Sequence, residues 1–122
     1  MPFQKLLKQL VDGIEGASGA ILLESAGEAV QWHVVDESTV ERLRLRSAYV
    51  AVVLQNSQTV ASRADAGEVA HLVLQYDGAS FIAQAVERDY CVVLELCAGA
   101  NIGQAIYHLQ AAIEGLRSAM AE

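Results

Sequence analysis

The spacing of apolar residues divides the chain into eight elements. Apolar residues three and four positions apart are typical of amphipathic helices, whereas short apolar or alternating runs bounded by glycines and polar turns are typical of strands. Asn101 is a favourable N-cap residue, so the last helix is predicted to begin there. In order, the predicted elements are a helix over 3–14, strands over 19–24 and 28–35, a helix over 38–61, strands over 68–76, 79–86 and 90–97, and a helix from 101.

The order α-β-β-α-β-β-β-α predicts the α/β (α+β) class with a five-stranded, mostly antiparallel sheet. Turns of hairpin length join most successive strands, and Asp77-Gly78 is a pair that tight hairpins prefer. Strand 90–97 is apolar on both sides apart from Glu95, which is typical of a central strand covered on both faces. At 122 residues the chain is predicted to form a single domain, residues 1–122.

The segment 38–61 has two competing patterns. Residues 41–46 alternate like a strand, but Ser38-Thr39-Val40-Glu41 fits a capping box. No glycine or proline occurs between Glu28 and Ala66, which also favours a long helix. Wound at about 100° per residue, this helix has two apolar faces. The first face has Val40, Leu43, Val50, Ala51 and Leu54, and the second has Leu45, Ala48, Tyr49, Val52 and Val53.

The second apolar face of this helix has a consequence for assembly. A helix that packs only on its own sheet needs a single apolar stripe. The second face therefore predicts another cover, and a second copy of the chain is the simplest one. The alternative is a helix that is completely buried inside the monomer.

Charge and composition exclude several classes of partner. The net charge of −7 argues against nucleic acid and anionic membrane surfaces, since both need a basic protein surface. No apolar run is long enough to span a bilayer, and we expect no secretion signal. Cys91 and Cys97 share one predicted strand and lie roughly 20 Å apart, too far for a disulfide. These features predict a cytoplasmic protein whose cysteines fill the core.

The residues that usually form catalytic or metal sites are scattered. His33, His71 and His108 have no ligand spacing to a cysteine or to one another. The chain has neither a P-loop nor a nucleophile elbow. We therefore expect no catalytic residue, no metal and no cofactor, and hence no enzymatic activity.

Arginines gather in one short stretch. Arg42, Arg44 and Arg46 are three of the eight basic residues. On a helix, Arg42 and Arg46 share a face, whereas Arg44 points away. They are either solvated charges or part of an edge that docks a polar or acidic partner.

Short motifs occur in a characteristic order between residue 3 and about residue 120. They are Gly16-Ala17-Ser18-Gly19-Ala20 before Ile21-Leu22-Leu23-Glu24, Ala26-Gly27-Glu28 at the following turn, the long central helix, and Asn101-Ile102-Gly103-Gln104-Ala105 after the fifth strand. Together they resemble a free-standing bacterial or archaeal member of the Roadblock / dynein light chain family. The resemblance implies a profilin- or longin-like layering, with the long helix on one face of the sheet and the two terminal helices on the other.

The resemblance also implies how the chain assembles and acts. Family members pair side by side through the long helix and the third strand, and they regulate or scaffold small Ras-like GTPases. The alternatives are a structural adaptor without effect on GTP turnover and a sensor that binds a small ligand in an apolar pocket. The implied dimer interface is Leu45, Ala48, Val52, Asn56, Val69, Leu72 and Val73, and the implied GTPase-binding residues are Arg42, Arg46, Tyr49 and Val53.

Overall fold

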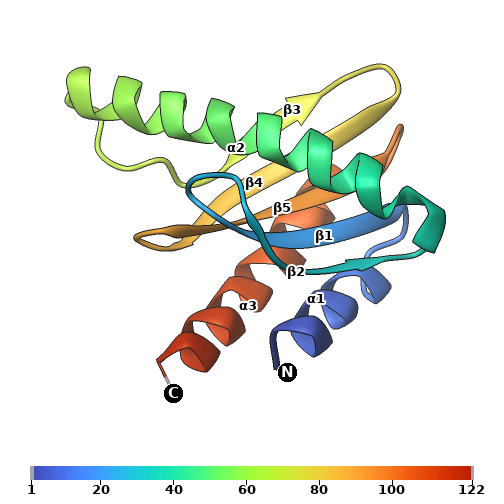
Figure 1. Cartoon of the computed structure of the whole chain (residues 1–122). Helices are drawn as coiled ribbons and strands as arrows, with labels where there is room; N and C mark the ends of the chain where they lie inside the picture. The colour runs from blue at the N-terminus through green and yellow to red at the C-terminus, as the bar shows by residue number, and fades with distance from the viewer. Residues whose placement is uncertain (1, 122) are drawn as a thin grey trace.

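The computed structural model describes residues 2–121, and its elements follow the predicted order (Figure 1). The elements are α1 Pro2–Asp12, β1 Ala17–Glu24, β2 Ala29–Val34, the short 3-10 helix η1 Glu37–Thr39, α2 Val40–Arg63, β3 Leu72–Gln75, β4 Ala79–Glu87, β5 Tyr90–Cys97 and α3 Ile102–Met120.

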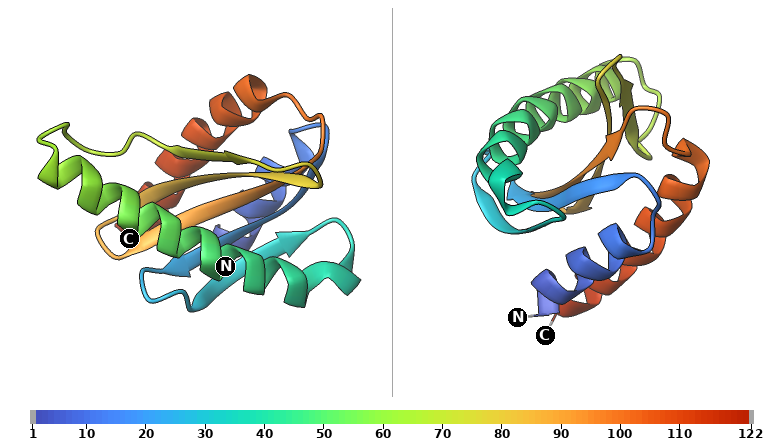
Figure 2. Two further views of the ribbon diagram at one scale, coloured as in Figure 1. Left: turned by 90° about the horizontal axis from the view of Figure 1, so that it is seen from above. Right: turned by 90° about the vertical axis from the view of Figure 1, so that its right-hand side faces the viewer.

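The molecule has three layers. The five strands form one antiparallel sheet in the order β2-β1-β5-β4-β3. Helix α2 crosses one face of the sheet, and α1 and α3 lie side by side on the other (Figures 1 and 2). The predicted fold class and layering are confirmed. Within residues 2–121, no helix has the length and apolar character needed to cross a bilayer.

Each face of the sheet has its own apolar core, because the side chains of a strand alternate between the faces. In β5, Val92 and Leu94 pack toward α1 and α3, whereas Cys91 and Val93 pack toward α2. All four are buried, so the prediction of a central strand covered on both sides is confirmed. The largest buried side chains are Leu7, Leu22, Ile82, Leu94, Leu96, Leu109, Ile113 and Leu116 on the first side and Ile21, Leu23 and Leu43 on the α2 side.

The start of α2 differs from the prediction. Asp36 caps the preceding η1, because its Oδ1 accepts hydrogen bonds from the Ser38 amide at 3.0 Å and from the Ser38 hydroxyl at 2.8 Å. Thr39 is the N-cap of α2 and makes no side-chain cap hydrogen bond. The predicted capping box is therefore wrong, since the Ser38 hydroxyl is used by Asp36.

Strand β3 is shorter than the predicted 68–76 and has four residues, Leu72–Gln75. The end of α2 projects beyond the sheet (Figure 1), and the chain uses residues 64–71 to return. Asp65 and Gly67 have φ angles of 53° and 90°, which reverse the chain direction there. Val69 consequently lies before β3 rather than in it.

A β-bulge between β1 and β2 changes the direction of Val30. Val30 is the extra residue between the partners of Leu22 and Leu23. Simple alternation predicts that Val30 shares a face with Trp32 and Val34. In the structure Trp32 and Val34 pack toward α2, whereas Val30 lines a hollow on the α1–α3 side of the sheet.

Candidate interaction surface

The side of α2 that points away from the sheet carries a row of mostly apolar residues. The apolar members of this row are between 37% and 67% exposed, so nothing within residues 2–121 covers them. The alternative of a completely buried helix is therefore wrong. A contiguous row of exposed apolar side chains is a candidate interaction site. We call the row the outer face of α2, and its members are Leu45, Tyr49, Val52, Val53, Asn56 and Val60.

One flank of α2 faces the β3–β4 turn. A hollow of about 310 Å³ opens there, and Arg46, Tyr49, Tyr76 and Phe81 are among the residues that line it. Tyr49 and Tyr76 are 67% and 60% exposed, and the Tyr76 ring meets Phe81 edge-on with 6.2 Å between centroids. Tyrosine and arginine are enriched in the hot spots of protein interfaces, so this β3–β4 flank is a candidate contact point.

The opposite flank of α2 faces the β1–β2 turn. A Cβ on Gly27 would lie 3.7 Å from the Cβ of Ala48, and the Gln55 side-chain amide donates a hydrogen bond to a carbonyl of the same turn. Near the start of α2, the Arg44 guanidinium lies 5.1 Å from the centroid of the Trp32 ring in β2, which is a cation–π arrangement. This β1–β2 flank therefore faces the β2 edge of the sheet.

A partly buried ion pair joins α2 to the middle of the sheet. Arg46 Nη1 donates a hydrogen bond to Glu95 Oε2 at 3.2 Å, and Ser18 Oγ donates to Glu95 Oε1 at 2.8 Å. The Glu95 side chain is 4% exposed and that of Arg46 is 41% exposed. A buried carboxylate needs a charged or hydrogen-bonding partner. Arg46 therefore compensates a charge in the core and is more than a solvated cation.

The other two arginines of the cluster differ from Arg46. Arg44 Nη1 lies 3.5 Å from Glu41 Oε1, an exposed pair that contributes little stability. Arg42 makes no ion pair in the described part of the chain. The pKa of Asp36 is lowered mainly by the hydrogen bonds from Ser38, and Arg42 adds only a small electrostatic contribution. The charge of Arg42 is therefore available to a partner.

Strand β3 leaves one edge of the sheet unpaired. It pairs with β4, and no strand within residues 2–121 pairs with its other side. Leu72 packs toward α2, and Val73 packs toward α1 and α3. Val69 packs toward α2 from the segment before the strand. An open edge of this kind can pair with a strand of another chain.

The structure separates some of the predicted contact residues. Ala48, predicted at the dimer interface, lies on the β1–β2 flank, away from the β3 edge. Arg46 and Tyr49, predicted to bind a GTPase, lie on the β3–β4 flank. Tyr76 was missed, because a tyrosine in a turn gives no sequence signal that it lies near α2. The others lie on the outer face or at the β3 edge: Leu45, Val52, Val53, Asn56, Val69, Leu72 and Val73.

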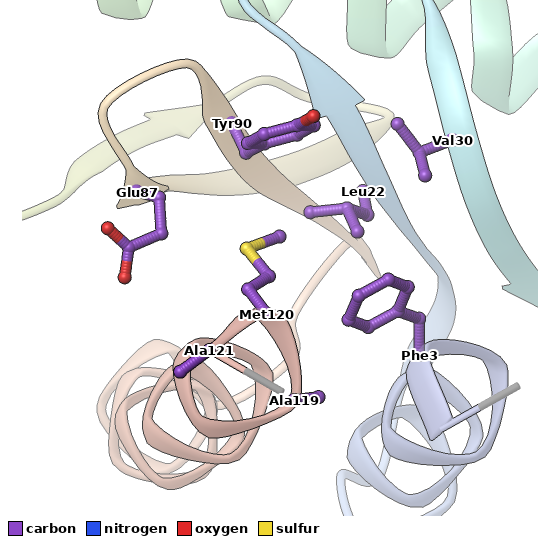
Figure 3. Close-up of a pocket in the computed structure, with 8 residues that line it drawn as sticks. All are labelled: Phe3, Leu22, Val30, Glu87, Tyr90, Ala119, Met120 and Ala121. Atoms are coloured by element: carbon purple, nitrogen blue, oxygen red, sulfur yellow. The ribbon is translucent and has the colours of Figure 1, made fainter.

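A larger hollow lies on the opposite face of the sheet (Figure 3). It has a volume of about 590 Å³ and opens between the start of α1 and the end of α3. This volume is in the range of small-molecule sites, and the lining is mainly apolar. The residues that line it are Phe3, Leu22, Val30, Glu87, Tyr90, Ala119, Met120 and Ala121.

The side chains that could hold a metal are dispersed. Residues 2–121 contain no group of three or more histidine, cysteine, aspartate or glutamate side chains placed to bind an ion. Cys91 is buried, and burial raises the pKa of its thiol to about 11. Cys97, at the end of β5, is exposed, so the prediction that both cysteines fill the core is wrong for Cys97.

Solved Roadblock structures share this fold. The Roadblock/LC7 domain from Streptomyces avermitilis is 17% identical, with a TM-score of 0.86 over 98% of each chain. The gliding protein MglB from Thermus thermophilus is 18% identical, with a TM-score of 0.83 over 96% of this chain and 87% of that one. A structure of MglB with a tetrameric arrangement is 18% identical, with a TM-score of 0.81 over 96% of this chain and 88% of that one.

These comparisons show that the chain has the Roadblock/LC7 fold, as its sequence motifs implied. A scan of the sequence against models of protein families matched none of them, and a search of curated proteins found no relative.

Proposed function

We propose that this protein is a homodimeric regulator that binds a small Ras-like GTPase and modulates its nucleotide state. It acts in the cytoplasm through protein–protein contacts, without a catalytic site of its own. The fold supports this proposal, because the chain has the Roadblock/LC7 fold, and the Roadblock family that its sequence motifs resemble regulates or scaffolds small Ras-like GTPases. The observation that carries it is the uncovered apolar outer face of α2 beside the unpaired β3 edge.

The homodimer follows from how these two features lie together. An exposed apolar helix face and an open strand edge both favour association. A second copy that pairs on β3 would extend the sheet and cover part of α2. Sedimentation equilibrium over a range of protein concentrations measures this directly. A mass equal to one chain at all concentrations would contradict the homodimer.

The action on a GTPase requires an experiment that identifies the partner and then measures turnover. The tagged protein is incubated with native lysate in the presence of a non-hydrolysable GTP analogue or of GDP. A Ras-like GTPase retained mainly with the GTP analogue is the expected result. The purified pair is then compared with the GTPase alone for its rates of nucleotide exchange and GTP hydrolysis. Rates that are both unchanged would contradict the regulator.

A structural adaptor is the first alternative, and the same experiment separates it from the regulator. An adaptor retains its partner equally in both nucleotide states and leaves the turnover rate unchanged. A GTPase-binding surface alone does not distinguish these two roles, because both need the outer face of α2.

A small-ligand sensor is the second alternative, and the hollow between α1 and α3 favours it. That hollow has the volume and the apolar lining of a ligand site. A ligand that binds the folded protein raises its melting temperature by mass action. A screen of apolar small molecules by thermal melting tests this role, with Val30→Asp, at a lining residue that is 38% exposed, as the variant that should lose the response.

A further inference from the structure

We propose that the hollow between the start of α1 and the end of α3 binds a small molecule that has an apolar body and a protonated amine. The apolar body lies against Phe3, Leu22 and Val30, and the ammonium group lies beside the Glu87 carboxylate. This inference does not depend on the proposed GTPase partner, because the hollow and the outer face of α2 lie on opposite faces of the sheet.

Elements that are far apart in the sequence form this hollow. Phe3 comes from α1, Leu22 from β1 and Met120 from α3, and Figure 3 shows these three side chains around its centre. Leu22 is completely buried in the folded chain, so the floor of the hollow is the sheet itself. The volume of about 590 Å³ is sufficient for a small organic molecule.

The β-bulge between β1 and β2 supplies one wall of the hollow. Without the bulge, Val30 would point to the α2 side of the sheet with Trp32. Instead it lines the hollow and is 38% exposed, so the bulge places an apolar side chain where the core does not cover it. Bulges next to functional sites re-aim side chains in this way. Val30 is therefore an apolar surface that a ligand can cover.

The remaining apolar lining suits an aromatic or aliphatic body. Phe3, Tyr90 and Met120 are all half-buried, so each presents part of its side chain to the hollow. The rings of Phe3 and Tyr90 offer flat surfaces against which another ring can pack. Met120 is unbranched and flexible, and a methionine of this kind adapts to the shape of what it contacts.

The charge of the hollow specifies the second part of the ligand. Among residues 2–121, Glu87 is the only charged residue that lines it, and Glu87 lies at the left-hand margin in Figure 3. Arg88 and Arg117 share a neighbouring hollow with Glu87, but neither forms an ion pair with its carboxylate in this part of the chain. Arg117 instead donates a hydrogen bond from Nε to the Val86 carbonyl at 2.6 Å. The Glu87 carboxylate is therefore available to a cation.

The same charge disfavours the other ligands that an apolar hollow could hold. A fatty acid would place its carboxylate near Glu87, in a protein whose net charge is already −7. An uncharged apolar molecule would use the lining but leave Glu87 without a partner. An amine uses both parts of the site. Because Glu87 is exposed to solvent, its ion pair with the ligand contributes only modestly, and the preference for an amine is a severalfold one.

Three probes with one apolar body and different head groups test the proposal. Phenylbutylamine, phenylbutanol and phenylbutyrate carry an ammonium, a hydroxyl and a carboxylate group, and isothermal titration calorimetry with the full chain measures the Kd of each. We expect the amine to bind about fivefold more tightly than the alcohol, and the carboxylate to bind most weakly. Glu87→Gln should reduce the preference for the amine to less than about twofold and leave binding of the alcohol unchanged. Val30→Asn adds a polar group without a charge, so it should weaken all three probes and keep the preference.

Asp77→Asn is the matched control. It removes the same charge from the β3–β4 turn, leaves an Asn-Gly pair that suits a tight turn, and should keep the preference for the amine. Far-UV circular dichroism verifies that each variant is folded. Equal affinity of the wild-type protein for the amine and the alcohol would overturn the role of Glu87, as would a preference that survives Glu87→Gln or is lost equally in Asp77→Asn. No binding of any probe, or unchanged binding in Val30→Asn, would overturn the hollow as the site.

Discussion

The ion pair between Arg46 and Glu95 makes a sharp prediction about stability. Arg46→Ala removes the guanidinium that lies 3.2 Å from a carboxylate with 4% exposure. The carboxylate then keeps only the hydrogen bond from the Ser18 hydroxyl. We therefore expect Arg46→Ala to destabilise the fold, although Arg46 itself is 41% exposed and substitutions of exposed residues usually cost little.

The size of the effect follows from the burial of the two partners. Removing one partner of a buried ion pair costs about 3–5 kcal/mol. Water reaches the Arg46 side of this pair, and Ser18 still supports Glu95, so we expect a smaller loss of about 2–3 kcal/mol. For a domain of this length, each kcal/mol shifts the melting temperature by roughly 4 °C, so the expected decrease is roughly 10 °C.

Urea unfolding followed by the fluorescence of Trp32 measures this loss at one fixed protein concentration, because self-association stabilises the folded state. Glu95→Gln is the rescue: an amide needs no counter-charge and still accepts a hydrogen bond from Ser18. Arg46→Ala combined with Glu95→Gln should be within about 1 kcal/mol of Glu95→Gln alone. Arg42→Ala is the matched control and should change stability by less than about 0.5 kcal/mol.

Two results would refute this account of Arg46. One is a cost for Arg46→Ala as small as that for Arg42→Ala. The other is strict additivity in the double variant, which would show that Arg46 and Glu95 are not coupled. Because charge reversal at Arg46 would also disturb its contact with the buried Glu95, charge reversal at Arg42 is the cleaner test of partner binding.

Three further outcomes follow from single contacts. Gly19→Ala should cost about 1–3 kcal/mol in urea unfolding, because a Cβ there would lie 3.0 Å from Leu43 Cδ2; an unchanged midpoint would show that the site has room. Asn101→Ala removes the N-cap hydrogen bond of α3 and should cost about 1 kcal/mol, measured by thermal melting. Iodoacetamide should modify the exposed Cys97 and spare Cys91, whose thiol pKa is raised to about 11 by burial; two adducts per folded chain by mass spectrometry would contradict this.

The order of elements could be predicted because most segments carry a clear period and clear ends. Strand β5 was recognisable from a short sequence that is apolar on both faces apart from Glu95, as is typical of a strand covered on both sides. The start of α3 was recognisable from Asn101, whose side chain accepts a hydrogen bond from the Gln104 amide. In both cases a local pattern and the global fold favour the same structure.

Strand β3 and the bulge at Val30 could not be predicted, because neither is set by local sequence. Residues 68–71 lead into the apolar run of the strand without a glycine or proline between them, but the chain uses them to return from the projecting end of α2. Val30 alternates correctly with its neighbours, yet an extra residue relative to β1 turns it to the other face. The start of β3 depends on how far α2 extends beyond the sheet, and the direction of Val30 depends on the register of β2 against β1.

The ion pair of Arg46 with Glu95 could not be predicted either, because it also depends on the tertiary structure. Arg42 and Arg46 are one helical turn apart and have the same chemistry, so the helical period treats them as equivalent. Their difference comes from Glu95, which is 49 residues away and lies under Arg46 only because β5 is in the middle of the sheet. A charge inside an apolar strand was the visible signal, since a buried glutamate predicts a basic partner somewhere in the fold.

The sequence-based prediction placed Ala48 and Val69 in one interface because a local pattern does not show where a helix lies relative to the edges of the sheet. A helical wheel gives the angle between Val52 and Val53, but it does not say which sheet edge each of them faces. That depends on the direction in which α2 crosses from β2, at one edge, to β3, at the other. Once that direction is known, the two apolar flanks cease to be equivalent, because one of them lies on the side of β3 and the other on the side of β2.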